Sequence, residues 1–172
     1  MKLLGRVFSY FTWALLAFLV VQKIIVWNKE SQQKGLPVQN KLVQVIQANG
    51  TTALQPLLNA NQKKILIFWA TWCAPCKLEL SRVQSMIDNH TLDPHKVIAI
   101  SLYEDPQLVW RTSQERKYSF PIGVDPRGEI SQDFKVTGTP TTVYVADEKI
   151  QSISTGLSLL LEKSFKGFLA SP

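Results

Sequence analysis

The distribution of apolar and polar residues divides the chain into three parts. Residues 7–27 are almost continuously apolar, residues 28–41 are polar, and after them short apolar segments alternate with polar ones. A helix that covers such an apolar run is about 31 Å long, which matches the hydrocarbon thickness of a bilayer. We therefore expect a membrane anchor over residues 1–27, a linker over residues 28–41 and one folded domain over residues 42–172.

The residues at the end of the apolar run favour an uncleaved anchor over a cleaved signal peptide. It ends in Ile24-Ile25-Val26-Trp27, whereas a cleaved signal peptide ends in small residues that the peptidase recognises. Basic residues lie on both sides of the run, so the rule that basic residues stay inside indicates the orientation only weakly.

Within the folded part, the pattern predicts strands that alternate with helices. Continuous apolar runs over residues 64–70 and 97–102 are typical of strands buried on both faces. We expect a short helix from Thr52 to about Asn59, directly after the turn signal at Asn49-Gly50. Alternating strands and helices predict an α/β fold with a mixed, mostly parallel central sheet covered by helices on both faces. Further strands are expected over 42–46, 120–124, 141–146 and 149–155, and further helices after Cys76, over 105–117, over 129–134 and from a cap at Ser158 to about residue 169.

The charge balance does not indicate a nucleic-acid partner. The chain has 19 basic and 13 acidic residues, a net charge of +6. Lys2, Arg6 and Lys23 account for half of this excess, because no acid lies in residues 1–27. The remaining basic residues form no clustered stripe with interleaved aromatics, so we expect no nucleic-acid site.

The two cysteines of the chain, Cys73 and Cys76, lie where a buried strand is expected to pass into a helix. A helix N-terminus favours an ionised thiol, because its unpaired N–H groups and the helix dipole stabilise negative charge. Pro75 fits the first helical turn and stiffens the loop. The spacing indicates a redox pair in which Cys73 attacks a disulfide and Cys76 resolves the mixed disulfide.

The sequence allows three other interpretations of the cysteines. The spacing of Cys73, Cys76, His90 and His95 matches that of a zinc finger, but Pro94 interrupts the helix that both histidines would share. A purely structural disulfide would close a very small loop and constrain little of the unfolded chain. A Cu(I) site built from the two thiolates remains an alternative.

Two segments resemble signatures of a known superfamily. Residues 68–76 read Phe-Trp-Ala-Thr-Trp-Cys-Ala-Pro-Cys, and residues 136–141 read Val-Thr-Gly-Thr-Pro-Thr. Both are similar to segments of the thioredoxin superfamily, in particular of its membrane-anchored, exported TlpA/ResA-like and ScsD-like thiol:disulfide oxidoreductases. The resemblance spans about residues 38–170 and implies a thioredoxin fold, a central mixed sheet flanked by helices.

The resemblance also implies the roles of individual residues. Cys73 and Cys76 would be the catalytic cysteines, and Trp72 would border the active-site surface. Thr139-Pro140 would be a cis peptide that faces the disulfide, with the Thr139 backbone free to pair with an extended substrate segment.

One residue departs from the thioredoxin pattern. Ile67 stands where thioredoxin has a buried acid, so that proton acceptor is absent. Glu79 matches an acid of the exported branch and is a candidate for proton transfer at Cys76. The alternative for Glu79 is an ordinary solvated glutamate in the first turn of a helix.

Together these features predict a single-pass protein of the bacterial inner membrane, anchored by residues 7–27, with its thioredoxin-like domain in the periplasm. We expect a thiol:disulfide oxidoreductase that uses the Cys73–Cys76 disulfide with no other cofactor and no metal. The expected partners are protein thiol or disulfide substrates and a transmembrane electron-transfer protein. A reductase of exported substrates, of the cytochrome c maturation or copper-protein assembly type, is favoured over a Cu(I)-binding module or a net disulfide oxidant.

Overall fold

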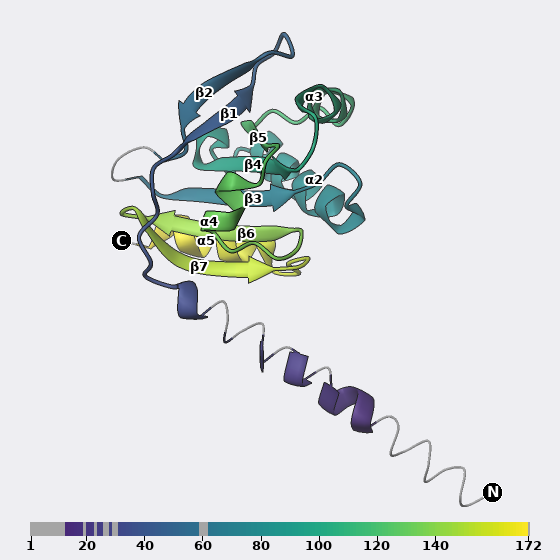
Figure 1. Ribbon diagram of the computed structural model, residues 1–172, viewed down its shortest axis with the longest axis vertical. Coiled ribbons are helices and arrows are strands. Elements are labelled where there is room, and N and C mark those ends of the chain that lie inside the picture. Colours follow the sequence, from purple (N-terminus) through teal and green to yellow (C-terminus); the bar gives the residue numbers. More distant parts are fainter. Residues whose placement is uncertain are drawn as a thin grey trace, which may run out of the picture.

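A seven-stranded sheet forms the centre of the folded part of the chain, with the strand order β2-β1-β5-β4-β3-β6-β7 (Figure 1). The computed structural model describes residues 13–18, 20–22, 24, 25, 28, 31–58 and 62–171. The strands are β1 (Leu42–Ile46), β2 (Thr52–Pro56), β3 (Lys64–Trp69), β4 (Val97–Leu102), β5 (Ile122–Asp125), β6 (Thr141–Ala146) and β7 (Lys149–Thr155). The helices are α2 (Ala74–Asp88), α3 (Pro106–Glu115), α4 (Glu129–Asp133) and α5 (Leu161–Ala170), and a short 3-10 helix, η1 (Pro94–Lys96), precedes β4.

The sheet is mixed, as the sequence predicted, but it is less parallel than expected. Strands β3, β4 and β5 run parallel to one another. Strands β1 and β6 pair with this group in the antiparallel direction, and β2 and β7 extend the two edges as the outer arms of hairpins. The prediction of a mostly parallel sheet was wrong, because the hairpins at both edges add antiparallel pairs that need only short connections.

Strand β3 is buried on both of its faces. Ile65, Ile67 and Trp69 join the apolar cluster that contains the two cysteines, whereas Leu66 and Phe68 join the cluster on the opposite face. All five side chains are fully buried. Because full burial of such a side chain contributes about 1.5–3 kcal/mol, this strand is held firmly in place on both sides.

Helices cover both faces of the sheet, as expected. Helices α2, α3 and α5 place Leu80, Val109 and Phe165 in the cluster around the cysteines. Helix α4 adds Ile130 to the cluster on the other face, and Phe134 follows it there. Figure 1 shows α5 behind β6 and β7, where Phe165 meets Tyr144 of β6 edge to face, with ring centroids 5.9 Å apart. The strand that leads to the cysteines therefore lies between two helical layers.

Two predicted elements differ from the structure. The segment that follows Thr52 is not a helix but strand β2, which pairs with β1 after the Asn49-Gly50 turn. Pairing along the hairpin prevails over the helix cap because the turn returns the chain alongside β1. The last helix begins at Leu161, with Leu160 and not Ser158 as its N-cap. The Ser158 backbone N–H donates to Glu79 at 3.1 Å.

Part of the predicted anchor can be compared with the structure. Residues 13–18, 20–22, 24 and 25 are helical. Large apolar side chains in these residues, such as Trp13 and Phe18, are exposed. Within the described residues, we find no helix whose length and apolar character suffice for a membrane span. Residues 1–12, 19, 23, 26 and 27 of the predicted anchor lie outside the described residues.

The predicted linker contacts the domain near its end. The Gly35 N–H donates to the Ile150 carbonyl at 2.7 Å, and the Val38 N–H donates to the Glu148 carbonyl at 2.7 Å. Between them, Pro37 forms an isolated bridge with Lys149 of β7. These bonds fix residues 35–38 against the edge of the sheet.

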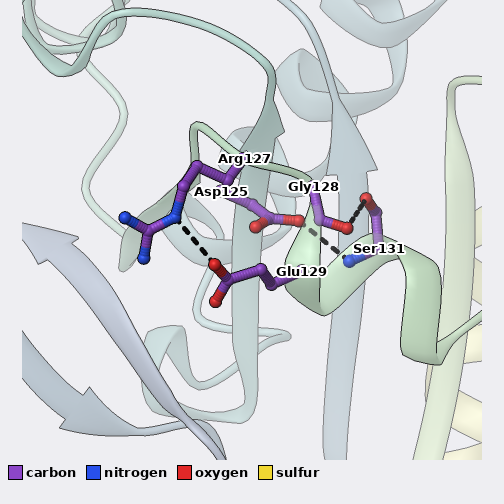
Figure 2. A network of polar contacts seen from close by, with 5 residues as sticks. All are labelled: Asp125, Arg127, Gly128, Glu129 and Ser131. Atoms are coloured by element: carbon purple, nitrogen blue, oxygen red, sulfur yellow. Dashed lines mark hydrogen bonds and ion pairs between the residues drawn. The ribbon is translucent and has the colours of Figure 1, made fainter.

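A polar turn joins β5 to α4. Figure 2 shows the buried Asp125 carboxylate accepting the Ser131 N–H at 2.8 Å, while the Ser131 hydroxyl donates to the Gly128 carbonyl at 3.0 Å. Arg127 and Glu129 form an ion pair at 2.7 Å on the exposed side. Gly128 has a φ of +73°, and a Cβ added there would lie 2.2 Å from the Tyr103 ring.

The turn yields a prediction about stability. Gly128→Ala should lower the free energy of unfolding by about 1–3 kcal/mol, because a positive φ is unfavourable for alanine and its Cβ must displace the Tyr103 ring. Gly156→Ala is the matched control, since Gly156 has a φ of +91° with nothing within 4 Å of an added Cβ. This control variant should lose only the free energy of unfolding that comes from the strained backbone, about 1 kcal/mol. Urea denaturation measures both, and equal losses in the two variants would contradict the contact with Tyr103.

Candidate active site

The two cysteines lie at the junction of β3 and α2, where the sequence placed them. They form a disulfide with Cα atoms 5.2 Å apart. Cys73 is the N-cap of α2, and its sulfur accepts the Cys76 N–H at 3.2 Å. Pro75 lies in the first turn of the helix, as expected. Cys73 is 3% exposed and Cys76 is fully buried, so Cys73 is the outer cysteine, the one that a substrate reaches first.

A tight turn separates the end of β3 from the disulfide. It covers Ala70 to Cys73 and is closed by the Cys73 N–H, which donates to the Ala70 carbonyl at 3.1 Å. Trp72 stands on this turn with 75% of its surface exposed, whereas Trp69 is fully buried at the end of β3. The turn thus presents a large aromatic surface directly beside the outer cysteine.

The Thr139-Pro140 peptide bond is cis, as the resemblance implied. It directly precedes β6, whose first residue, Thr141, is paired with Phe68 of β3. This pairing brings the cis peptide to the edge of the sheet at which β3 ends and the disulfide begins. Thr139 is half-buried and Pro140 is buried.

Glu79 is a buried acid and not the solvated glutamate of the alternative interpretation. It is 1% exposed. One carboxylate oxygen accepts the Thr142 hydroxyl at 2.9 Å, and the other accepts the Ser158 N–H at 3.1 Å. Burial raises the pKa of Glu79 above the ordinary carboxyl value, and the hydrogen bonds from Ser158 and Thr142 oppose this shift in part.

The position of Glu79 bears on the acid that is missing at Ile67. Ile67 is paired with Thr142 across β3 and β6, and Thr142 is the residue whose hydroxyl binds Glu79. The carboxyl group therefore reaches the sheet beside Ile67, but it comes from the helix. Because Glu79 follows Cys76 by three residues, both side chains lie on the buried face of α2. A carboxyl group with a raised pKa in this place is suited to exchange a proton with the Cys76 thiol.

One residue near the site was missed in the sequence. Glu104 lies just after β4, and its carboxylate accepts the Thr71 N–H at 3.1 and 2.9 Å. It also accepts the hydroxyl groups of Thr71 and Ser101. Its position in the sequence could have indicated it, because Glu104 is the first acid after a buried strand that runs parallel to β3.

The zinc interpretation finds no support in the geometry. Cys73 and Cys76 are bonded to each other, His90 follows the end of α2, and His95 lies in η1. Among the residues that the structure describes, no three His, Cys, Asp or Glu side chains are grouped closely enough to hold a metal ion.

Comparison with known proteins identifies the family. The family model described as AhpC/TSA family matches residues 38–153. The chain belongs to this family. The prediction of a thioredoxin-like fold is thereby confirmed, together with the mixed sheet and its flanking helices.

Individual relatives of this AhpC/TSA chain point to the enzyme class. Sporulation thiol-disulfide oxidoreductase A of Bacillus subtilis is 32% identical over 111 residues, 63% of this chain and 67% of the relative. Thiol-disulfide oxidoreductase ResA of Oceanobacillus iheyensis is 31% identical over 106 residues, which span 61% of this chain and 54% of that protein. The crystal structure of StoA from Bacillus subtilis superposes with a TM-score of 0.63 at 26% identity, covering 77% of this chain and 98% of that structure. The predicted class, a thioredoxin-like thiol:disulfide oxidoreductase, is confirmed.

The buried carboxyl group predicts a dependence of stability on pH. Since its pKa is raised in the folded state, the native protein binds the Glu79 proton more tightly than the unfolded chain does. This contribution is present in full below the ordinary pKa of 4.5 and is lost as the pH rises through the raised pKa. Urea denaturation of the oxidised protein from about pH 4 to about pH 8 should show wild type losing stability relative to Glu79→Gln.

The exposed Glu129 provides the control for this experiment. Glu129→Gln also removes a carboxylate, but from a side chain that is 60% exposed and lies in the first turn of α4. If the free energies of unfolding of wild type and Glu79→Gln change in parallel over the whole pH range, the pKa of Glu79 is not raised in the folded state.

Proposed function

We propose that this protein is a membrane-anchored periplasmic reductase that passes electrons through Cys73 and Cys76 to disulfides of specific exported proteins. The observation that carries the proposal is the arrangement around the disulfide. Cys73 caps α2 at the outer side, and Glu79 lies buried behind Cys76. The sulfur that attacks and the sulfur that resolves thus have different surroundings, as thiol-disulfide exchange requires.

The proposed reaction has two steps. The Cys73 thiolate attacks a substrate disulfide, so that a mixed disulfide forms and one substrate thiolate leaves. Cys76 then gives up its proton and attacks the Cys73 sulfur, which restores the Cys73–Cys76 disulfide and releases the second substrate sulfur as a thiolate. Glu79 is the proposed acceptor of the Cys76 proton, and a transmembrane electron-transfer partner would reduce the disulfide again.

The charge near the sulfurs bears on the direction of electron flow. A thiol-disulfide enzyme is oxidising when its reduced form is stabilised, for instance by groups that favour a thiolate. An ionised Glu79 would act in the opposite sense, because a neighbouring negative charge disfavours a thiolate. The pair would then give up its electrons more readily than it would without this carboxylate, which supports a reductase. The substrates of the cytochrome c maturation or copper-protein assembly type follow from the resemblance to the exported branch.

The proposed location rests on the apolar run over residues 7–27. A disulfide enzyme of this kind works where protein disulfides persist, and the periplasm is such a compartment. An uncleaved N-terminal anchor with a short linker would hold the domain close to the membrane surface, within reach of a transmembrane electron donor.

The redox potential tests the proposed direction. In the full-length protein in detergent, titration against glutathione should place the Cys73–Cys76 couple near or below about −250 mV. Glu79→Gln should raise this potential by about 30 mV, the equivalent of about 1.4 kcal/mol for a two-electron couple. A wild-type value near about −120 mV would be that of an oxidant and would refute the reductase.

The proposed location is tested by topology. Alkaline phosphatase fused after Pro172 should be active in cells, because that reporter needs the oxidising periplasm to form its disulfides. A fluorescent or enzymatic reporter that works only in the cytoplasm is the matched fusion. Activity of the cytoplasmic reporter with an inactive phosphatase would overturn the periplasmic placement.

A further inference from the structure

The turn that carries Trp72 and Cys73 is anchored from outside by one side chain. Within the turn, the Cys73 N–H is bonded to the Ala70 carbonyl. The Thr71 N–H has left the ladder between β3 and its neighbours, which ends at the pairs of Phe68 and Trp69. That N–H donates to Glu104, 33 positions further along the chain.

Glu104 is itself held in a defined position. It follows β4, the parallel neighbour of β3, in which Ser101 is paired with Trp69 at the last step before the turn. The Ser101 hydroxyl donates to one carboxylate oxygen of Glu104, and the Thr71 hydroxyl donates to the other. With the Thr71 N–H, which lies 3.1 and 2.9 Å from the two oxygens, the carboxylate binds three donor groups. Hydrogen bonds to a charged acceptor are about twice as strong as neutral ones, so this contact is well suited to fix a turn.

The geometry points to Glu104 as a positioning residue for disulfide exchange with protein substrates. Its carboxylate clamps Thr71 and so fixes the turn on which Trp72 is exposed and from which Cys73 enters α2. In the oxidised structure the carboxylate of Glu104 is hydrogen-bonded to Thr71 and Ser101, and to neither cysteine. The inference rests on the thiol:disulfide oxidoreductase class and holds for either direction of electron flow, so it stands apart from the proposed reductase.

A clamp of this kind should matter more for large substrates than for small ones. A folded protein must align its disulfide with the Cys73 sulfur while it packs over Trp72, so a loosened turn misplaces both contacts together. An error of about 1 Å in such an alignment can cost up to about 100-fold in rate. A small disulfide needs only the sulfur itself and tolerates a mobile turn.

The test compares a protein disulfide and a small disulfide with the same variant. Glu104→Gln keeps the size of the side chain, but its amide nitrogen cannot accept a hydrogen bond from Thr71 or Ser101. The reduced full-length enzyme is mixed with insulin or with oxidised glutathione. Two electrons and two protons pass from Cys73 and Cys76 to the added disulfide as the enzyme disulfide forms. The second-order rate constant should fall about tenfold with insulin and less than twofold with oxidised glutathione.

Two further substitutions keep the test decisive. Thr71→Val removes the hydroxyl bond but leaves the N–H bond to Glu104, and it should lower the insulin rate by about threefold, whereas Thr71→Ser should retain more of the rate than Thr71→Val. If Glu104→Gln does not fold, the comparison of Thr71→Val with Thr71→Ser serves as the test. Equal rates with insulin in these two variants would overturn the positioning role of Glu104. Glu129→Gln is the matched control for the loss of an exposed carboxylate and should leave both rates unchanged.

The remaining outcomes have distinct meanings. Equal loss with insulin and oxidised glutathione, together with a shifted pH profile, would mean that Glu104 acts through its charge on Cys73 and not by positioning, and would overturn the inference. A lowered urea midpoint with both rates unchanged would mean a purely structural role and would also overturn it. If the wild-type enzyme exchanges disulfides but proves to be an oxidant, the proposed reductase is refuted. The role of Glu104 is then still decided by the rates of the variants above.

Discussion

The burial of β3 between two apolar clusters is the constraint on which the active site depends. Its five central and terminal side chains are fully buried and alternate between the faces of the sheet. A strand held in this way cannot slide or twist without losing about 1.5–3 kcal/mol for each side chain that leaves the core. Its end at Trp69 therefore fixes where the next turn begins and where Cys73 caps α2. The cis peptide before β6 and Glu104 after β4 are placed by strands that pair with β3 on its two sides.

The same constraint explains how an acid reaches the cysteines without a place in the strand. Ile67 belongs to the apolar layer beneath α2, and an acid there would have to be buried within β3 itself. Glu79 instead extends from α2 toward β6, where Thr142 and the Ser158 backbone satisfy its oxygens. A buried carboxyl group is tolerated only with such partners, since an unpaired one costs several kcal/mol or gives up its charge. The outer cysteine and the inner acid are thus positioned by different elements around one strand.

Much of the fold could be predicted from the sequence, because strongly periodic segments specify their own structure. The apolar runs at β3 and β4 and the hairpin of β6 and β7 lie where the pattern indicated. Strand β2 was missed because Thr52 is a good helix cap in isolation, while its pairing with β1 depends on the whole hairpin. The two cysteines were evident from their spacing. The sequence does not decide whether Glu79 is buried, because helical periodicity puts it beside Cys76 but does not show whether a partner lies opposite. Glu104 could not be assigned, because its contact with Thr71 is purely tertiary.

Trapping a reaction intermediate is the most direct test of the two roles, attack by Cys73 and resolution of the mixed disulfide by Cys76. In cells that express the full-length protein, Cys76→Ser should accumulate mixed disulfides with other proteins through Cys73, because no second thiol is present to resolve them. Cys73→Ser should accumulate none, and reducing agent should release the trapped proteins. Absence of adducts in Cys76→Ser, combined with stoichiometric Cu(I) retained by the wild-type protein, would contradict a redox pair and indicate a metal-binding module.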